Sequence, residues 1–259
     1  MLRSRITPCL LRQNGGLVKT RQFKDPKYVG DPLNAVKIFN EKEVDELMFL
    51  DIDATVQRRD PDFTLLRNLA VESRMPLCYG GGITNAYQAT RIIALGVEKV
   101  SISAAAVHRP MLIKEMAEAV GAQSVVVTLD VRKNKLFSGY TVYTCNGREQ
   151  SKANLLEFCQ QAVELGAGEI VINSIDRDGE MAGYDLDLAR KVRESVTCPI
   201  SVLGGAGSVG HIRDLIEAVG VVGAAAGSMF VFKGIYRAVL INYPGKDEKD
   251  SLLGMRALH

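Results

Sequence analysis

The sequence predicts a (β/α)8 barrel, an α/β fold in which eight parallel strands alternate with helices. Eight short apolar runs typical of buried strands alternate with amphipathic stretches typical of helices. No break in composition divides the 259 residues, so we expect one domain. The chain also repeats itself, as two half-barrels would. A doubly wound open sheet is the alternative, but eight parallel units favour closure.

The predicted strands are rich in small and β-branched residues, as strands buried on both faces are. The run SVVVTLD, which ends at Asp130, shows this most clearly. The predicted strands are Arg5–Leu11, Glu46–Ile52, Met75–Tyr79, Val97–Ile102, Ser124–Asp130, Glu169–Ser174, Ile200–Leu203 and Val221–Ala226. The predicted helices are 34–44, 63–74, 86–96, 110–121, 155–166, 186–195, 211–220 and 232–241.

The repeat relates half-barrels at about 1–121 and 122–245, followed by a C-terminal tail at 246–259. Its segments lie 119 to 124 residues apart: 5–11 with 124–130, 45–53 with 168–176, 80–84 with 204–208, and 96–103 with 220–227. Equivalent groups should therefore lie on opposite sides of one mouth.

Each half carries a candidate phosphate site, with a glycine-rich turn after its third strand and small residues after its fourth. Backbone N–H groups at a helix start bind phosphate, and glycine lets the anion approach. Tight turns need glycine too, but two copies in register favour phosphate, so a ligand with a phosphate at each end would span the mouth. The residues are Gly80–Gly82, Ser103 and Ala104 in one half, and Gly204, Gly205, Gly207, Gly227 and Ser228 in the other.

Asp130 ends the central strand and precedes a basic turn. An Asp in this place is either a cap for the following loop or a catalytic group at the mouth of the barrel. The composition and the strand pattern are compatible with either role of Asp130.

At the opposite face, Arg5, Glu46, Lys99 and Glu169 stand at the starts of four predicted strands, with alternating signs. They form either a solvated rim or, if they point inward, a ring of ion pairs. Because burying such a ring costs desolvation, a buried ring would serve a switch or a passage.

The composition excludes several classes of protein. A formal net charge of +2 implies no nucleic-acid partner. The five cysteines form no C-x-x-C pair, which predicts neither a metal site nor disulfides and suits a reducing cytoplasm. No apolar run reaches 18 residues, so we expect a cytoplasmic protein without a membrane span.

Nearly the whole chain resembles the cyclase (HisF) subunit family of imidazole glycerol phosphate synthase, a lyase of histidine biosynthesis. The motifs are R-I-x-P-C-L at 5–10, V-K at 18–19, DELMFLDID at 45–53, GGGI, VEKVSIS, AGEI, SIDRDG at 174–179 and GGAG. The resemblance implies a class I glutaminase on the N-terminal barrel face. Its ammonia would cross the barrel and react at the top with a formimino ribonucleotide that carries two phosphates; no cofactor is implied.

The resemblance also implies roles for individual residues. Arg5, Glu46, Lys99 and Glu169 match the gate that ammonia passes, Asp130 matches one of two catalytic aspartates, and Lys19 matches the lysine of the loop after the first strand. Gly82 and Ser103 fall at one phosphate site, and Asp178, Gly179, Gly205, Gly227 and Ser228 fall at the other.

At two places the sequence departs from the family pattern, and both departures bear on the expected cyclase activity. Leu11 stands where the other catalytic aspartate should be, and leucine cannot move a proton. Because such a group contributes about 10²–10⁴-fold, we expect cyclase activity to be weak or lost. The family's Asn-Thr pair at one phosphate site is Ser103-Ala104, which puts binding of the family substrate in question.

With an intact gate and a lost acid–base pair, the chain resembles a paralogue branch of the HisF family. The members of this branch act in surface-sugar pathways such as lipopolysaccharide synthesis. The segments R-x-x-P-C-L-L, FKDPKYVGDP at 23–32 and YRAVLINYP at 236–244 carry this likeness. It implies that the barrel supplies ammonia to a separate sugar amidotransferase. The alternatives are a genuine cyclase that uses Asp130, and a barrel that binds a phosphorylated ligand without ammonia traffic.

Overall fold

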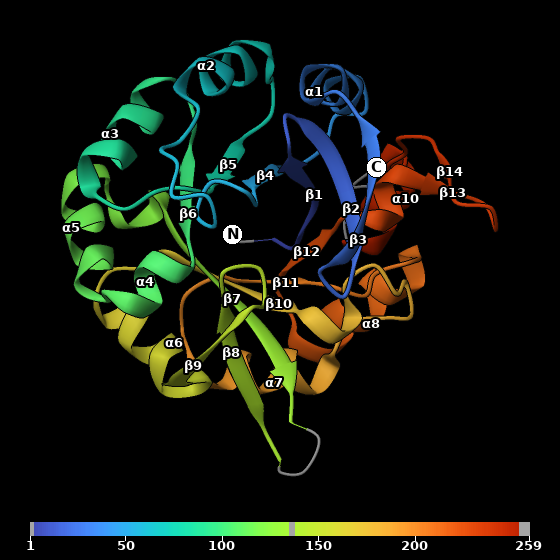
Figure 1. Ribbon diagram of the computed structural model, residues 1–259. Coiled ribbons are helices and arrows are strands. Elements are labelled where there is room, and N and C mark those ends of the chain that lie inside the picture. The colour runs from blue at the N-terminus through green and yellow to red at the C-terminus, as the bar shows by residue number, and fades with distance from the viewer. Residues whose placement is uncertain (1–2, 135–137, 254–259) are drawn as a thin grey trace, which may run out of the picture.

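The computed structural model describes residues 3–134 and 138–253 and has the shape of a barrel, with strands inside and helices outside (Figure 1). Eight parallel strands form the wall in the order β1–β4–β5–β6–β7–β10–β11–β12, and pairing of β12 with β1 and of β7 with β10 closes it. The predicted barrel is thus confirmed and the open sheet is excluded. The wall strands are β1 (Arg5–Gln13), β4 (Leu47–Asp51), β5 (Leu77–Gly80), β6 (Lys99–Ile102), β7 (Val125–Lys133), β10 (Glu169–Ser174), β11 (Ile200–Leu203) and β12 (Gly223–Ala226).

Seven of the eight predicted helices are present. Most begin at an Asp, Asn or Ser whose side chain accepts a hydrogen bond from a backbone N–H of the first turn, as N-caps do. They are α1 (Pro32–Glu41), α2 (Phe63–Glu72), α3 (Ala86–Ala94), α5 (Met111–Val120), α6 (Leu155–Glu164), α7 (Leu186–Ser195) and α8 (Val209–Val219). Shorter helices are α4 (Ala104–His108), α9 (Ser228–Val231) and α10 (Lys246–Leu252), with 3-10 turns at Ala122–Ser124 and Ile175–Arg177.

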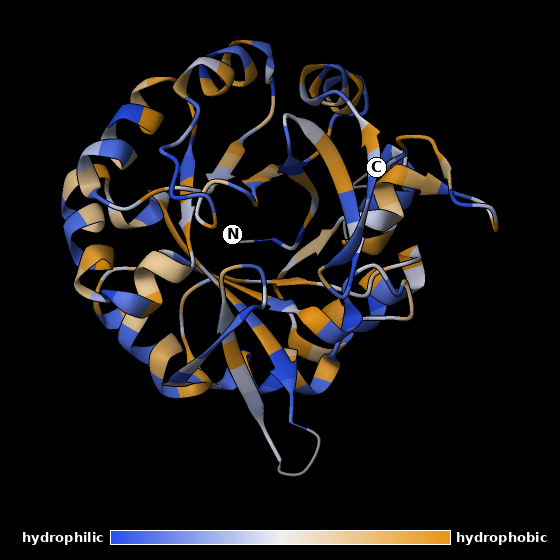
Figure 2. Ribbon diagram, viewed as in Figure 1, coloured by the Kyte–Doolittle hydropathy of each residue, from blue (hydrophilic) through white to orange (hydrophobic). Residues whose placement is uncertain are grey.

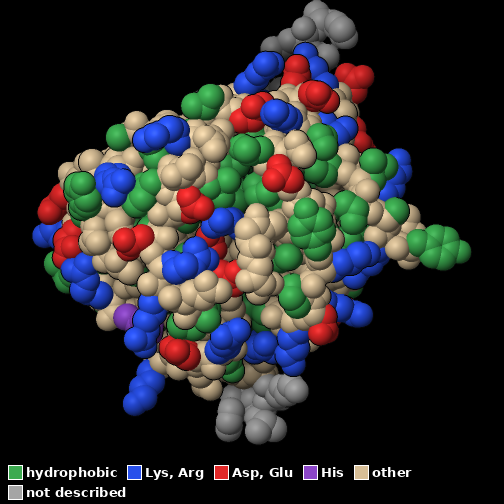
Figure 3. Space-filling view, turned by 45° about the horizontal axis from the view of Figure 1, so that its top comes forward, with side chains coloured by type: hydrophobic (Ala, Val, Ile, Leu, Met, Phe, Trp, Pro, Cys, Tyr) green, Lys and Arg blue, Asp and Glu red, His purple; other side chains and the backbone are tan. Residues whose placement is uncertain are grey.

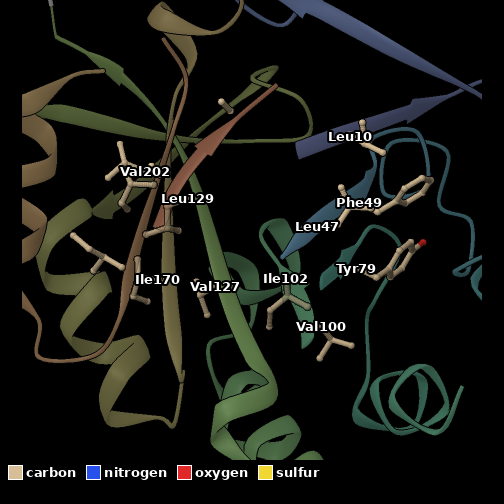
Figure 4. Packing of buried hydrophobic residues seen from close by; sticks show 14 of the residues in the cluster. Leu10, Leu47, Phe49, Tyr79, Val100, Ile102, Val127, Leu129, Ile170 and Val202 are labelled. Atoms are coloured by element: carbon tan, nitrogen blue, oxygen red, sulfur yellow. The ribbon is translucent and has the colours of Figure 1, made fainter. Parts of the chain in front are cut away.

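Alternate residues of each strand enter two separate cores. The outer core lies between strands and helices, where Leu47, Phe49 and Tyr79 lie on neighbouring strands (Figure 4). The inner core fills the barrel and consists of Cys9, Met48, Cys78, Val126, Val171, Leu203 and Ala225, with Leu11 and Leu50 packed against it. In the ribbon coloured by hydropathy, hydrophobic residues recur along the wall strands, and hydrophobic and hydrophilic residues alternate along the helices (Figure 2). Burial on both faces explains why the strands are continuous apolar runs.

A β-hairpin follows the first strand of each half. After β1 come β2 (Gly16–Arg21) and β3 (Lys24–Gly30), and after β7 come β8 (Tyr140–Thr144) and β9 (Glu149–Asn154). Both hairpins extend the sheet beyond the wall (Figure 1). These four strands were not predicted from the sequence, because they are short and mix polar with apolar residues.

The helix predicted at 232–241 is wrong. These residues form an antiparallel hairpin of β13 (Phe232–Lys233) and β14 (Ala238–Val239). Gly234 has a φ of +72° and Arg237 a φ of +49°, which a helix cannot accommodate. Ile235 and Tyr236, which suggested a helix face, lie in the turn and are 88% and 89% exposed.

The space-filling view shows basic and acidic side chains interspersed over the face that it presents (Figure 3). A hydrophobic side chain stands out at the right edge, on the side where Figure 1 places the β13–β14 hairpin. The expected tail at 246–259 begins with α10, and its residues 254–259 lie outside the described part. None of the described helices is long and apolar enough to span a membrane.

Candidate functional site

A cavity of about 1020 Å³ lies at the carboxyl ends of the wall strands. It gathers nearly all the residues predicted from the sequence for this end of the barrel, among them Leu11, Lys19, Gly82, Ser103, Asp130, Asp178, Gly179, Gly205, Gly227 and Ser228. Gly207, predicted with the second glycine-rich turn, is not among the residues that line the cavity. The cavity also reaches down to inward-facing side chains of the barrel, including Ser101 and Thr128. In barrels of this kind, ligands are bound at this face.

The two glycine-rich turns line opposite parts of the cavity wall and need glycine for conformation as well. Gly82 has a φ of +72° and Gly205 a φ of +108°. A Cβ would lie 2.4 Å from the backbone oxygen of Arg59 at the first and 2.1 Å from that of Gly183 at the second. These turns are therefore built for close backbone approach, which a phosphate site also requires.

Asp130 lies near the end of β7, beside Asn173 of β10. The two are register partners in the parallel pair, and Asn173 Nδ2 donates a hydrogen bond of 2.8 Å to Asp130 Oδ1. Burial raises the pKa of Asp130 to about 7, with a further rise from the charge of Asp178, while the hydrogen bond from Asn173 opposes the rise. A carboxyl with this pKa can both accept and donate a proton near neutrality.

Leu11 and Leu50 occupy the corresponding place in the first half. They are register partners on β1 and β4 and pack against the inner core. In the repeat, Leu11 corresponds to Asp130 and Leu50 to Asn173. The polar pair of one half is thus an apolar pair in the other.

The β2–β3 hairpin is fastened to the loop after β10. Thr20 Oγ1 donates to Asp178 Oδ2 at 2.6 Å, and the N–H of Phe23 donates to the same oxygen at 3.1 Å. A Cβ at Gly179 would lie 2.2 Å from the backbone oxygen of Thr20. Asp178 and Gly179 therefore hold the hairpin against the second half.

The same hairpin carries Lys19, which is 4% exposed. Its Nζ donates to the backbone oxygen of Cys9 and lies at the cavity beside Gly227. Burial lowers the pKa of Lys19, and the charge of Asp178 counteracts this. The hairpin thus places a buried amine at the mouth.

The β8–β9 hairpin crosses to the other half. At its tip, Asn146 has a φ of +59° and donates from Nδ2 to the backbone oxygen of Ile52 at 2.8 Å. Each half therefore sends one hairpin over the mouth to the other. Asn146 and Asn173 were both missed by the sequence analysis; for Asn173, the repeat offset and the place of Asp130 could have located it.

Four charged side chains meet at the opposite end of the barrel. Glu46 accepts from Arg5 Nε at 2.5 Å and from Lys99 Nζ at 2.8 Å. Glu169 pairs with Lys99 at 2.9 Å and with Arg5, which completes a ring of alternating charge. Ser201 adds a hydrogen bond of 2.5 Å to Glu169.

The ring is largely removed from water, since the side chains of Glu46 and Glu169 are each 7% exposed. Burial alone would raise the pKa of Glu169, but Arg5 and Lys99 outweigh it and lower this pKa. Burial likewise opposes the charge of Lys99, but Glu169 and Glu46 raise its pKa. Glu169 and Lys99 are therefore charged at neutral pH.

Hydroxyl groups line the interior between the ring and the cavity. Ser101 Oγ and Thr128 Oγ1 share a hydrogen bond of 2.7 Å. Thr7 Oγ1 is buried and has no hydrogen-bond partner among the described residues. Polar groups thus occur at several levels of an otherwise apolar interior.

The fold and its two ends define a class: (β/α)8 barrels with a doubled glycine-turn mouth and a closed ionic ring. The chain belongs to the histidine biosynthesis protein family, which it matches over residues 5–236. This confirms the family resemblance found in the sequence.

Several relatives narrow this placement to HisF-like barrels. A Vibrio vulnificus (strain YJ016) protein, provisionally named imidazole glycerol phosphate synthase subunit hisF3, is 55% identical over 253 residues, covering 98% of this chain and 97% of the relative. A Leptospira borgpetersenii protein, provisionally named as the HisF subunit, is 52% identical over 97% of this chain and 99% of the relative. The HisF subunit of Streptococcus sanguinis (strain SK36), named without qualification, is 40% identical over 89% of this chain and 91% of the relative.

Proposed function

We propose that this chain is the barrel subunit of a glutamine-dependent complex. It receives ammonia from a class I glutaminase at the N-terminal face, passes it through the barrel and releases it at the cavity. The observation that carries the proposal is the combination of a complete ionic ring below and an incomplete catalytic pair above.

The ring supports entry of a small molecule at the lower end. Its charges alternate and neutralise one another, and each carboxylate contacts both cations. A buried ring is weak support for stability, because desolvation offsets much of the attraction. A gating function would explain the ring, because a passage for ammonia must open for that molecule and stay closed to water.

The mouth supports delivery of ammonia rather than ring closure. Cyclisation needs protons moved on both sides of the new ring, which suits two opposed carboxylates. Leu11 removes one of them, and its neighbour Leu50 offers no substitute. We therefore propose that an acceptor enzyme, a sugar amidotransferase of surface-polysaccharide synthesis, uses the ammonia, and that a small phosphorylated ligand occupies the glycine turns.

A binding experiment tests the proposal. The purified chain is mixed with the class I glutaminase subunit of the same organism, and complex formation and glutamine hydrolysis are measured together. We expect a stable complex with faster hydrolysis than the glutaminase shows alone. Lys99→Ala, which breaks the ring, should alter the hydrolysis rate, whereas Arg109→Ala in an exposed ion pair should not. A glutaminase that neither binds nor responds would contradict the proposal.

The second candidate is a genuine cyclase subunit of imidazole glycerol phosphate synthase that works with Asp130. Two observations favour it: the pKa of Asp130 near 7, and the 40% identity to a relative named as that subunit. The two candidates differ in whether the chain converts the formimino ribonucleotide when ammonium salt replaces the glutaminase.

A further inference from the structure

The Asp130–Asn173 pair stands where the barrel interior opens into the cavity. Thr128 lies two residues before Asp130 on β7, so both side chains face the same way. The Ser101–Thr128 hydrogen bond is therefore one level below the pair, inside the barrel. A small molecule that leaves the interior on this side meets Asp130 and Asn173 next.

Asp130 is a half-buried carboxyl at the cavity wall, without a positive partner. Among residues 3–134 and 138–253, no lysine, arginine or histidine forms an ion pair with it. The charge that shifts the pKa of Asp130 is that of another acid, Asp178, which raises it. Lys19, from β2, is engaged by the backbone oxygen of Cys9 on β1. A carboxylate in this position attracts a cation small enough to enter the site.

The side-chain oxygen of Asn173 is a hydrogen-bond acceptor to which no described residue donates. When Asp130 is ionised it only accepts hydrogen bonds, so Asn173 presents its Nδ2 group to Asp130, which directs Oδ1 away from it. This Oδ1 is buried and has no hydrogen-bond partner in the described part of the chain. An unpaired buried acceptor indicates that a donor is missing.

We infer that Asp130 and Asn173 form a binding site for a small nitrogen donor, ammonium or a primary amine, at the upper end of the barrel interior. The carboxylate supplies the charge, and the two side chains supply acceptors for N–H groups. Ammonia that meets the protonated carboxyl takes its proton, which leaves ammonium beside a carboxylate; return of the proton releases ammonia again. The inference rests on the proposed function only in taking ammonia as the molecule that arrives.

The apolar counterpart in the other half explains why there is one such site. Leu11 and Leu50 offer neither charge nor acceptor and face the same mouth. A nitrogen donor is therefore held on the β7–β10 side alone.

The test measures binding directly, without a glutaminase or a cyclase substrate. Protein with carbon-13 in its aspartate carboxyls is titrated by NMR from pH 5 to 9 at constant ionic strength, and Asp130→Asn assigns the signal. Sodium, potassium, ammonium, methylammonium and tetramethylammonium chloride are compared. We expect ammonium to lower the pKa of Asp130 by about 1 unit relative to sodium, because an adjacent cation favours the carboxylate.

The other salts and variants decide what the site recognises. A shift with ammonium but not methylammonium identifies ammonia itself as the ligand, whereas equal shifts extend the site to primary amines. Asn173→Leu, which copies the apolar half, should abolish the shift. Asn173→Ser serves as a milder version if the leucine variant folds poorly, and Asn242→Ser, on the outer surface, should leave the shift unchanged.

Several results would overturn the inference: no difference between ammonium and sodium, an equal shift with potassium or tetramethylammonium, which donate no N–H, or a full shift in both Asn173 variants. These results are independent of the glutaminase experiment. If the chain binds ammonium here but does not bind the glutaminase, this site stands and the proposed function is contradicted. If it binds the glutaminase but not ammonium, only the site is contradicted.

Discussion

The two halves of the mouth have the same backbone and opposite chemistry. In the second half, Asp130 and Asn173 are register partners joined by a hydrogen bond of 2.8 Å. In the first half, Leu11 and Leu50 are register partners that extend the inner core. The repeat therefore preserves the frame that positions a pair of side chains without preserving the chemistry of the pair. A reaction that needs catalytic groups on both sides of the mouth therefore cannot be inferred from the repeated backbone alone.

At the lower end, the halves remain interdependent. Glu46 and Glu169 are counterparts in the repeat, so each half gives one acid to the ring. Both cations, Arg5 and Lys99, come from the first half. The ring is thus built from residues of both halves, whereas the polar pair at the mouth comes from the second half alone.

The largest expected effect comes from making the mouth symmetric. Leu11→Asp would place a carboxyl opposite Asp130, and because each acid–base group contributes about 10²–10⁴-fold, cyclase activity should rise by about 100-fold or more above the wild-type background. A steady-state assay with the formimino ribonucleotide and ammonium salt measures this. Leu11→Asn, which is polar but moves no proton, is the matched control, and an equal gain in it would refute the explanation.

The ring offers the next largest effect. Glu46→Gln leaves two partly buried cations, 20% and 22% exposed, with one carboxylate, so the free energy of unfolding should fall by up to about 3–5 kcal/mol. Urea denaturation measures the loss. Glu115→Gln breaks the exposed pair with Arg109, where less than about 1 kcal/mol is expected. Similar losses in the two variants would mean that the ring is more hydrated than its burial indicates.

Asp130 should give the second half a pH dependence that the first half lacks. Its pKa is about 7 in the folded protein and about 3.9 in an unfolded chain. Between these values the folded state binds more protons, so this group's contribution to the free energy of unfolding falls as pH rises, by about 4 kcal/mol at most. Urea denaturation of the wild type and Asp130→Asn from pH 4 to 8 should show this difference, and parallel curves would exclude it.

The smallest effects concern the two hairpins that cross the mouth. Thr20→Val removes the bond to Asp178, and Asn146→Ala removes the bond to Ile52. Each should cost about 1 kcal/mol and speed hydrogen exchange in its own hairpin alone. Since Phe23 also binds Asp178, the β2–β3 hairpin should open less than β8–β9. Exchange that rises equally throughout the barrel would contradict local opening.

The wall of the barrel was predictable because a strand buried on both faces has an unmistakable apolar run, as at Val125–Lys133. Exposed elements gave no such signal. The strand Lys24–Gly30 is almost entirely exposed, and the apolar Ile235 and Tyr236 imitate a helix face from within a turn. The sequence places Leu11 opposite Asp130 through the repeat. It does not say which way Asn173 points, or that the four ring residues turn inward, because these depend on register.

The central claim is that the mouth, with Asp130 as its one proton-moving carboxyl in place of a pair, delivers ammonia and does not close an imidazole ring. The most direct measurement is a cyclase assay of the wild-type chain with the formimino ribonucleotide and saturating ammonium salt, without a glutaminase. We predict no turnover above the uncatalysed rate. Turnover within the ordinary enzyme range of about 1–10³ per second would contradict the claim and make Asp130 a sufficient catalyst.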